Sequence, residues 1–294
     1  MEPPFSPTLD RILAAEPPDL LFHYTSPTGL IGIVKEKQVW ATNITYLNDA
    51  KEIGHAVDYA MHFLKNLQAP HWTLEVRELL QQMHDNAGAA ARRIYLFSLT
   101  EERDLLSQWR AYCPPKGGYA IGLPSLQLKV MAKKQGFFLC RCVYDHAEQF
   151  AIIHEIVTEY IARYHKRRES GEEIKSARET TGWEFGQHLA LYGPVLKHPS
   201  FCEEREWRLI SGMIPETHPQ FDCRAGAAGL IPFFKFNLAD EEHSNVVNVN
   251  GVQAIVITGP CNDYGAANMS VQFLCKRYLD GVAFGQSCAP YRTW

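Results

Sequence analysis

The chain has 294 residues, of which 46% are hydrophobic, 12% aromatic and 21% charged. This composition excludes a disordered, collagen-like or coiled-coil protein and is sufficient for a sizeable core. The formal net charge of -4 gives no basic excess, so we expect neither nucleic acid nor an anionic membrane as a partner, while a local basic patch remains open.

No stretch approaches the roughly 18 consecutive apolar residues of a membrane helix. The N-terminal residues lack the basic and apolar regions of a secretory signal. The eight cysteines are scattered and form no CxxC pair. We therefore expect a cytoplasmic protein with reduced thiols and no metal.

Short strands and capped helices follow one another along the first half of the chain. Apolar or alternating runs predict strands, and apolar residues at helical spacing predict helices. In chain order, the predicted elements are a helix at Leu9–Ala15, a strand at Leu20–Tyr24, a helix from Ser26 to Lys37, a strand at Val39–Thr42, helices from Asp49 and over His71–Ala90, a strand at Arg92–Thr100, a helix at Asp104–Tyr112, and strands at Gly118–Leu123 and Phe137–Tyr144 on either side of a short helix.

The second half begins with a long helical segment. From about Asp145 to His198 the chain is predicted to be helical, with a break at Ser170-Gly171. The elements predicted after it are strands at Glu206–Ser211, Leu230–Asn237 and Val252–Thr258, a helix at Asn268–Leu279 and a strand at Val282–Phe284. This order predicts one α+β domain over residues 1–294, with an N-terminal arm at 1–19 and a helical insertion at 145–198 within the domain.

Several common site motifs are absent. The chain contains no GxGxxG, GxxxxGK[ST], HExxH or GxSxG sequence. Rossmann dehydrogenases, Walker ATPases, zincins and α/β-hydrolases therefore lack their main sequence support. Four segments instead place polar side chains within apolar elements, and these are the candidate sites.

The first segment is HYTSPTGL, residues 23–30. His23 lies near the end of a predicted strand that leads into a helix, and Tyr24, Thr25 and Ser26 follow it. The exposed amides of a helix N-terminus favour anions and polar ligand groups. The structural alternative is a buried histidine that is satisfied by a local hydrogen bond.

The second and third segments are TYLND, residues 45–49, and SLTEERDLLSQWRAY, residues 98–112. Asn48 fits a turn before a helix N-cap, and Tyr46 is either a hydroxyl donor in a cleft or a half-buried ring. Ser98 lies at the end of a strand. Trp109 and Tyr112 share one helix face, where they either stack on a ligand ring or pack against the sheet.

The fourth segment is FCEEREWRLI, residues 201–210. If it is extended, Trp207 and Leu209 point to the core, and Glu204, Glu206 and Arg208 share the other face. These charges either form a surface ladder or aim a carboxylate into a cleft. A carboxylate in a cleft can bind a ribose hydroxyl, stabilise a developing cation or act as a general base.

The motifs HYTS…GI, ITYLND..E, LFSLTEERDLLSQWRAY…GGYAIGL, KHPSFCEEREWRLI and IVITGP…CAPYR occur in this order over about residues 21–293. Each motif is short, but the ordered set is specific. With these motifs the chain resembles the bacterial family labelled domain of unknown function 2971, over nearly its whole length. The family label itself implies no activity.

The HxT strand and the helix after it, which contains glycine and isoleucine, are similar to the opening of ADP-ribosyltransferase folds. In the His-Tyr-Glu branch of these enzymes the His contacts the NAD ribose, an aromatic stacks on nicotinamide, and a late Glu supports the reaction. His23, Tyr46 and Glu206 match these positions, and Glu204 completes a Glu-x-Glu pair. The Ser-x-Thr sequence that begins at Ser98 is similar to the Ser-Thr-Ser strand of the other branch of these enzymes. Features of both branches in one chain are a departure from the family pattern.

This resemblance implies an enzyme with a split sheet that cleaves the nicotinamide–ribose bond of NAD and transfers ADP-ribose to an unknown macromolecular acceptor. Glu206 would hold the ribose and stabilise its charge, Glu204 would orient or deprotonate the acceptor, and Arg208 and Arg292 would bind the pyrophosphate. The implied catalytic residues are Glu206, Glu204 and His23, and the implied NAD-binding residues are Tyr24, Thr25, Ser26, Tyr46, Asn48, Ser98, Trp109, Arg208 and Arg292.

Three other interpretations stay open. The same residues would serve an NAD glycohydrolase that has no protein acceptor. They would also serve a non-catalytic module that binds a nucleotide-type small molecule or another protein. A thiol enzyme that uses Cys113 or Cys202 is the third. Bacterial ADP-ribosyltransferase-like proteins often act as toxins or phage-defence effectors, but no residue here indicates such a role.

Overall fold

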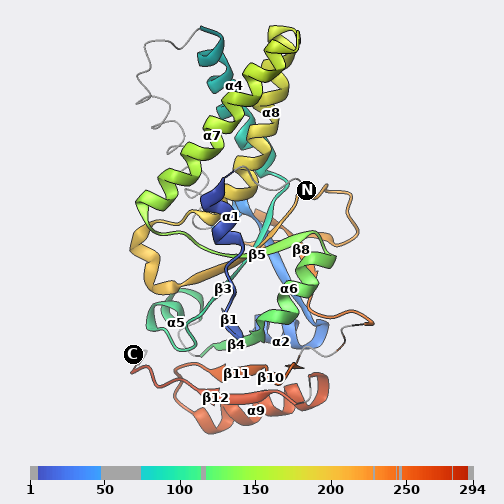
Figure 1. Cartoon of the computed structure of the whole chain (residues 1–294). Coiled ribbons are helices and arrows are strands. Elements are labelled where there is room, and N and C mark those ends of the chain that lie inside the picture. Colours follow the sequence, from blue (N-terminus) through green and yellow to red (C-terminus); the bar gives the residue numbers. More distant parts are fainter. Residues whose placement is uncertain are drawn as a thin grey trace.

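The computed structural model describes residues 6–47, 74–113, 117–227, 229–242, 244, 247–279 and 281–290. A ten-stranded sheet runs through the molecule (Figure 1). Its strands are β1 Leu20–Thr25, β2 Gln38–Asn43, β3 Tyr95–Thr100, β4 Tyr119–Pro124, β5 Phe137–Arg141, β6 Glu206–Ser211, β7 Phe221–Gly226, β8 Gly229–Asn237, β11 Ile255–Thr258 and β12 Ala283–Gln286. A separate hairpin contains β9 Asn248–Val249 and β10 Val252–Gln253.

The sheet order is β12-β11-β4-β1-β3-β2-β8-β7, with β6 paired to β3 and β5 paired to β6. The pairs are antiparallel except for β11 and β12, which are parallel. Mixed pairing with helices on both sides confirms the predicted α+β fold class.

Helices cover both faces of this sheet. They are α1 Pro7–Leu13, α2 Pro27–Glu36, α4 Leu74–Ala91, α5 Leu106–Tyr112, α6 Ser125–Lys134, α7 His146–Glu169, α8 Ile174–Tyr192 and α9 Tyr264–Tyr278. Buried residues of α1, α4, α7 and α8 form one core with Leu96, Cys140 and Ile210 of the sheet. Residues of α2, α6 and α9 form a second core, which includes Phe97 and Leu209. Adjacent strand residues thus point to opposite faces.

The helices α4, α7 and α8 lie together at one end of the molecule, and α9 lies at the other end beside β11 and β12 (Figure 1). The long helix α7 begins at the N-cap Asp145, whose carboxylate accepts a hydrogen bond from the backbone N–H of Glu148. Lys166, Arg167 and Arg168 occupy its last turn, where cations interact favourably with the helix dipole. This local chemistry explains why α7 lies where the sequence predicts it.

The sheet is split beside β3. One edge of β3 pairs with β6 along Leu96–Thr100. The other edge pairs with β2 near Leu96 and with β1 only at Thr100, where Phe22 is the partner. The strands β1 and β2 therefore diverge, and the β3 edge between the two pairings lines a cavity.

Some boundaries differ from the prediction. The second helix of the insertion ends at Tyr192, because Pro194 lies in the short 3-10 helix η2 Gly193–Val195. The strand β7 was not predicted, since none of its residues is buried and they show no apolar alternation. The helix predicted from Asp49 lies outside the described residues. Within the described part, none of the helices combines the length and apolar character that crossing a bilayer requires.

Candidate active site

A cavity of about 530 Å³ fills the split between β1 and β2. Its volume lies within the roughly 300–1,000 Å³ of small-molecule sites. The lining residues come from β1, α2, β2, β3, α5, β7, β8 and the 3-10 helix η1 Ile44–Tyr46. His23, Thr25, Ser26, Tyr46 and Ser98, all predicted from the sequence, line it together.

A second cavity of about 40 Å³ adjoins the first. The two cavities share His23, Ser98 and Tyr112 as lining residues, and Glu204 and Glu206 line the smaller one. The smaller space holds about one water molecule. The acidic pair and the histidine, which lie far apart in the sequence, thus face adjoining spaces.

His23 is held as a neutral imidazole. Its Nδ1 lies 3.0 Å from the carbonyl oxygen of Ser98, and its ring packs 4.3 Å from the ring of Phe97. Since a carbonyl only accepts hydrogen bonds, Nδ1 donates here and Nε2 is the acceptor. Burial lowers the pKa of His23 to about 4, the hydrogen bond to Ser98 opposes this shift, and the charge of Arg224 adds to it.

We expect His23 to make the stability of the fold pH-dependent. As the pH falls below 6.5, the His23 imidazole binds a proton in the unfolded chain, whereas in the folded chain it does so only near pH 4. The free energy of unfolding therefore falls between these two pH values. Urea unfolding at pH 7 and pH 5 measures the fall. His23→Asn should reduce it, and the exposed-site control His146→Asn should not. An unchanged fall in His23→Asn would contradict the assignment.

The acidic pair lies in a buried network of charges. Arg208 donates from Nε to Oε1 of Glu206 over 2.8 Å and from Nη2 to Oε2 over 3.0 Å. The Nζ of Lys197 binds Oε2 of Glu206 and, over 2.6 Å, Oε2 of Glu204. Burial alone would raise the pKa of Glu206, but Arg208 and Lys197 outweigh it and lower the pKa to about 2. Glu206 is therefore ionised at neutral pH.

Backbone contacts fix the position of this network. Glu204 ends the 3-10 helix η3 Pro199–Glu204, and Arg205 turns the chain into β6 with a φ of 41° in the left-handed region. The backbone N–H of Glu206 donates to the Tyr144 hydroxyl over 2.9 Å, and the carbonyl of Glu204 accepts from Thr100. The predicted shared strand face is therefore wrong for Glu204, which Lys197 joins to Glu206 from outside the strand.

Two predicted binding residues have structural roles. Trp109 is 1% exposed, and its Nε1 donates to Oδ1 of Asp104 over 2.7 Å. A ring buried in this way offers no face to a ligand, which corrects the predicted stacking. The guanidinium of Arg208 is engaged by Glu206 and by the carbonyl of Pro194 over 2.5 Å, which corrects its predicted role at a pyrophosphate.

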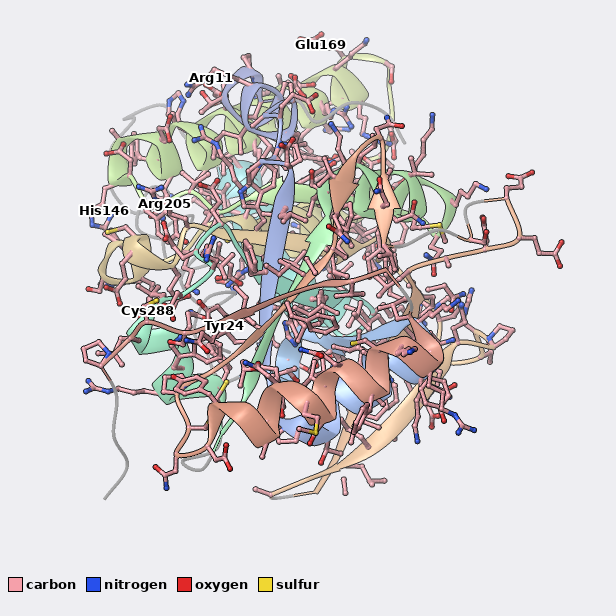
Figure 2. The ribbon with its side chains drawn as sticks, turned by 90° about the horizontal axis from the view of Figure 1, so that it is seen from below. Arg11, Tyr24, His146, Glu169, Arg205 and Cys288 are labelled. Atoms are coloured by element: carbon pink, nitrogen blue, oxygen red, sulfur yellow. The ribbon has the colours of Figure 1, made fainter. Side chains whose placement is uncertain are left out.

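Tyr24 lines the smaller cavity, but local hydrogen bonds engage its hydroxyl. The hydroxyl donates to the carbonyl of Glu102 and accepts from the N–H of Leu105, each over 2.8 Å. Asp104, which lies between Glu102 and Leu105, accepts a hydrogen bond from the backbone N–H of Cys288. Tyr24 and Cys288 lie on the same side of the molecule (Figure 2). The predicted residues Asn48 and Arg292 lie outside the described residues.

Tyr112, which the sequence places on the helix face with Trp109, lines both cavities. Three lining or network residues were not predicted in these roles. Trp40 and Arg224 line the larger cavity, and Lys197 joins the two carboxylates. The signals available for them were an aromatic within a predicted strand and two isolated cations. None of these signals separates a site residue from an ordinary surface residue.

The geometry defines an α+β protein with a ligand-sized cavity that adjoins a buried acidic pair. Residues 108–209 match the model of a family described as "Protein of unknown function (DUF2971)". The matched part contains Glu204 and Glu206, whereas His23 precedes it. This match confirms the expected similarity to domain of unknown function 2971 over these residues. No curated protein and no solved structure matched the chain.

Proposed function

We propose that the cavity in the split sheet binds NAD and that the protein cleaves the nicotinamide–ribose bond, transferring ADP-ribose to an acceptor. One observation carries this proposal: His23 and the pair Glu204 and Glu206, which lie far apart in the sequence, line adjoining spaces beside β3. The cavity volume suits a nucleotide-type ligand, and the sequence resemblance supplies the reaction class.

In the proposed reaction, the bond between C1′ of the ribose and the nicotinamide nitrogen breaks, and its electron pair leaves with nicotinamide. Positive charge then develops on the ribose ring. The ionised carboxylate of Glu206 stabilises this charge, while Lys197 and Arg208 fix the position of the carboxylate. An acceptor nucleophile bonds to C1′ and loses its proton to Glu204, which is the more exposed member of the pair.

The neutral His23 suits binding rather than proton transfer. Its Nε2 accepts a hydrogen bond from a ribose hydroxyl, because Nδ1 is held by Ser98. Tyr46 and Tyr112 line the cavity with side chains that are 50% and 47% exposed. Their rings provide stacking surfaces for the nicotinamide or adenine ring.

The test is the release of nicotinamide from NAD by the purified protein, with and without a cell extract as acceptor source. We expect release by the wild type and a loss on the order of 10²-fold or more in Glu206→Gln and Glu204→Gln. Glu203→Gln is the matched control, because Glu203 is an exposed residue of the same 3-10 helix. It should keep the wild-type rate.

Thermal melting of each variant shows whether it is folded. Absence of release by the wild type in both conditions would overturn the proposal. A fully active, folded Glu206→Gln would overturn the role of this carboxylate. Labelled ADP-ribose separates the two reaction types, because a labelled macromolecule indicates transfer and free ADP-ribose alone indicates hydrolysis.

One observation favours a second candidate, a non-catalytic nucleotide-binding module. Both carboxylate oxygens of Glu206 are engaged by cations, as in a purely structural network. Such a module would bind NAD and release no nicotinamide, so calorimetric binding beside the release assay distinguishes the two candidates.

A further inference from the structure

The end of the larger cavity formed by β2, β8 and β7 contains a cation that the proposed reaction centre does not use. Arg224 of β7 lines the cavity, and its Nη2 donates to Oγ1 of Thr42 over 3.0 Å. Its guanidinium carbon lies 5.9 Å from the centroid of the Trp40 ring. Trp40 packs in turn against Phe233, with 4.4 Å between ring centroids. The guanidinium is thus held by a hydroxyl on β2 and by an aromatic support.

The charge of Arg224 is not balanced by a carboxylate in the part of the chain that the structure describes. Among the described residues that line the larger cavity, Arg224 is the one that carries a formal charge. The ion pairs between described residues do not include it, although the neighbouring Lys235 pairs with Asp222 over 2.6 Å. Partial burial of a cation without a counter-ion is unfavourable, and an anionic ligand would offset this cost.

The chemistry of a guanidinium selects among anions. Its planar fork binds two oxygens of one phosphate, and in a partly desolvated cavity such a charge-assisted contact is stronger than at an open surface. The Trp40 ring, 45% exposed on the cavity wall, lies beside this position and is suited to stack on a base. Phosphate and base recognition therefore lie together on this wall.

We infer that Arg224, Thr42 and Trp40 form a subsite for the phosphate of a nucleotide, with the adenine-side phosphates of the dinucleotide bound here. This inference rests on the proposed function for the identity of the ligand. It adds the orientation of the dinucleotide in the cavity. The phosphates contact β2 and β7, and the nicotinamide ribose extends past His23 toward Glu206. The subsite then requires a substrate that carries phosphate, which is a nucleotide and not a nucleoside.

The test compares calorimetric binding of ADP and of adenosine, which differ only in the phosphates. We expect the wild type to bind ADP roughly 10-fold or more tightly than adenosine, as charged hydrogen bonds would produce. Arg224→Gln should remove this preference and leave adenosine binding unchanged. Arg224→Lys should keep part of the preference, because it retains the charge without the fork.

Lys235→Gln is the matched control, because Lys235 is a cation on the adjacent strand outside the cavity lining. It should bind ADP as the wild type does. Equal affinity of the wild type for ADP and adenosine, failure of both to bind, or wild-type ADP binding by Arg224→Gln would overturn the subsite. Nicotinamide release by the wild type tests the proposed function separately. Release without a preference for ADP would overturn the subsite alone, and a preference for ADP without release would overturn the proposed reaction alone.

Discussion

Replacing Lys197 by methionine is expected to lower the free energy of unfolding by about 3–5 kcal/mol. Lys197 is 2% exposed, and its Nζ contacts the carboxylates of Glu204 and Glu206. Methionine fills most of the volume but leaves a carboxylate buried beside one remaining cation, Arg208. Removing one partner of a buried ion pair costs far more than removing one partner of an exposed pair, because water cannot solvate the charge that remains.

Urea unfolding measures this effect, and Lys134→Met is the matched control. Lys134 also contacts two carboxylates, Asp240 at 2.7 Å and Glu242 at 2.6 Å, but at the surface of the molecule. The control should unfold nearly as the wild type does. Adding Glu204→Gln to Lys197→Met should restore part of the loss, because Glu204 loses its ion pair with Lys197 and is then neutral, whereas Glu206 keeps its pair with Arg208. An equal, small effect of Lys197→Met and Lys134→Met would contradict the buried network.

The helices that begin with strong local signals could be predicted from the sequence. The pair Ser26-Pro27 predicts the start of α2, and the Ser26 hydroxyl does accept from the N–H of Gly29. The strand β6 also has its predicted bounds. These features depend on residues a few positions apart. The order of strands in the sheet depends on contacts between distant segments, which no local pattern encodes.

The same distinction applies to the candidate site. His23 and Glu206 were proposed from the sequence because a polar residue in an apolar element is conspicuous. Lys197 was not, since a lysine after a helical segment is typical of an exposed helix end, and its burial beside Glu204 and Glu206 becomes visible only in the folded chain. Arg224 was missed together with β7, because an edge strand with exposed side chains lacks an apolar alternation.

Trp109 shows where spacing alone is insufficient. Trp109 and Tyr112 are three residues apart, so the sequence places them on one face of α5. In the structure, Trp109 lies in the small core with Phe22 and Tyr24, whereas Tyr112 is 47% exposed at the cavities. The short helix passes from the core to the rim of the cavity within this distance. Sequence spacing therefore identified the helix face but not which of its two aromatic residues lines the cavities.

Replacing Trp109 by alanine is expected to lower the free energy of unfolding by about 3–5 kcal/mol, the range for a large buried aromatic. The ring lies edge-on to Tyr24 with 4.5 Å between centroids, and its Nε1 binds Asp104. The fit against Gly259 is close, because a Cβ built there would lie 2.6 Å from Cζ3 of Trp109. Such a site cannot collapse easily, so most of the cavity left by the ring would persist.

Trp183→Ala is the matched control for the urea measurement, because Trp183 is 57% exposed on α8 and its loss should change stability by no more than about 0.5 kcal/mol. Trp109→Phe should fall between the two, since it keeps most of the ring contacts and loses the hydrogen bond to Asp104. The binding of ADP provides the decisive second readout. A Trp109→Ala protein as stable as Trp183→Ala but unable to bind ADP would show that the ring stacks on the ligand, which is one of the two roles that the sequence leaves open. If Trp109→Ala unfolds at a lower urea concentration than the wild type and its folded fraction still binds ADP, Trp109 supports α5 and does not contact the ligand.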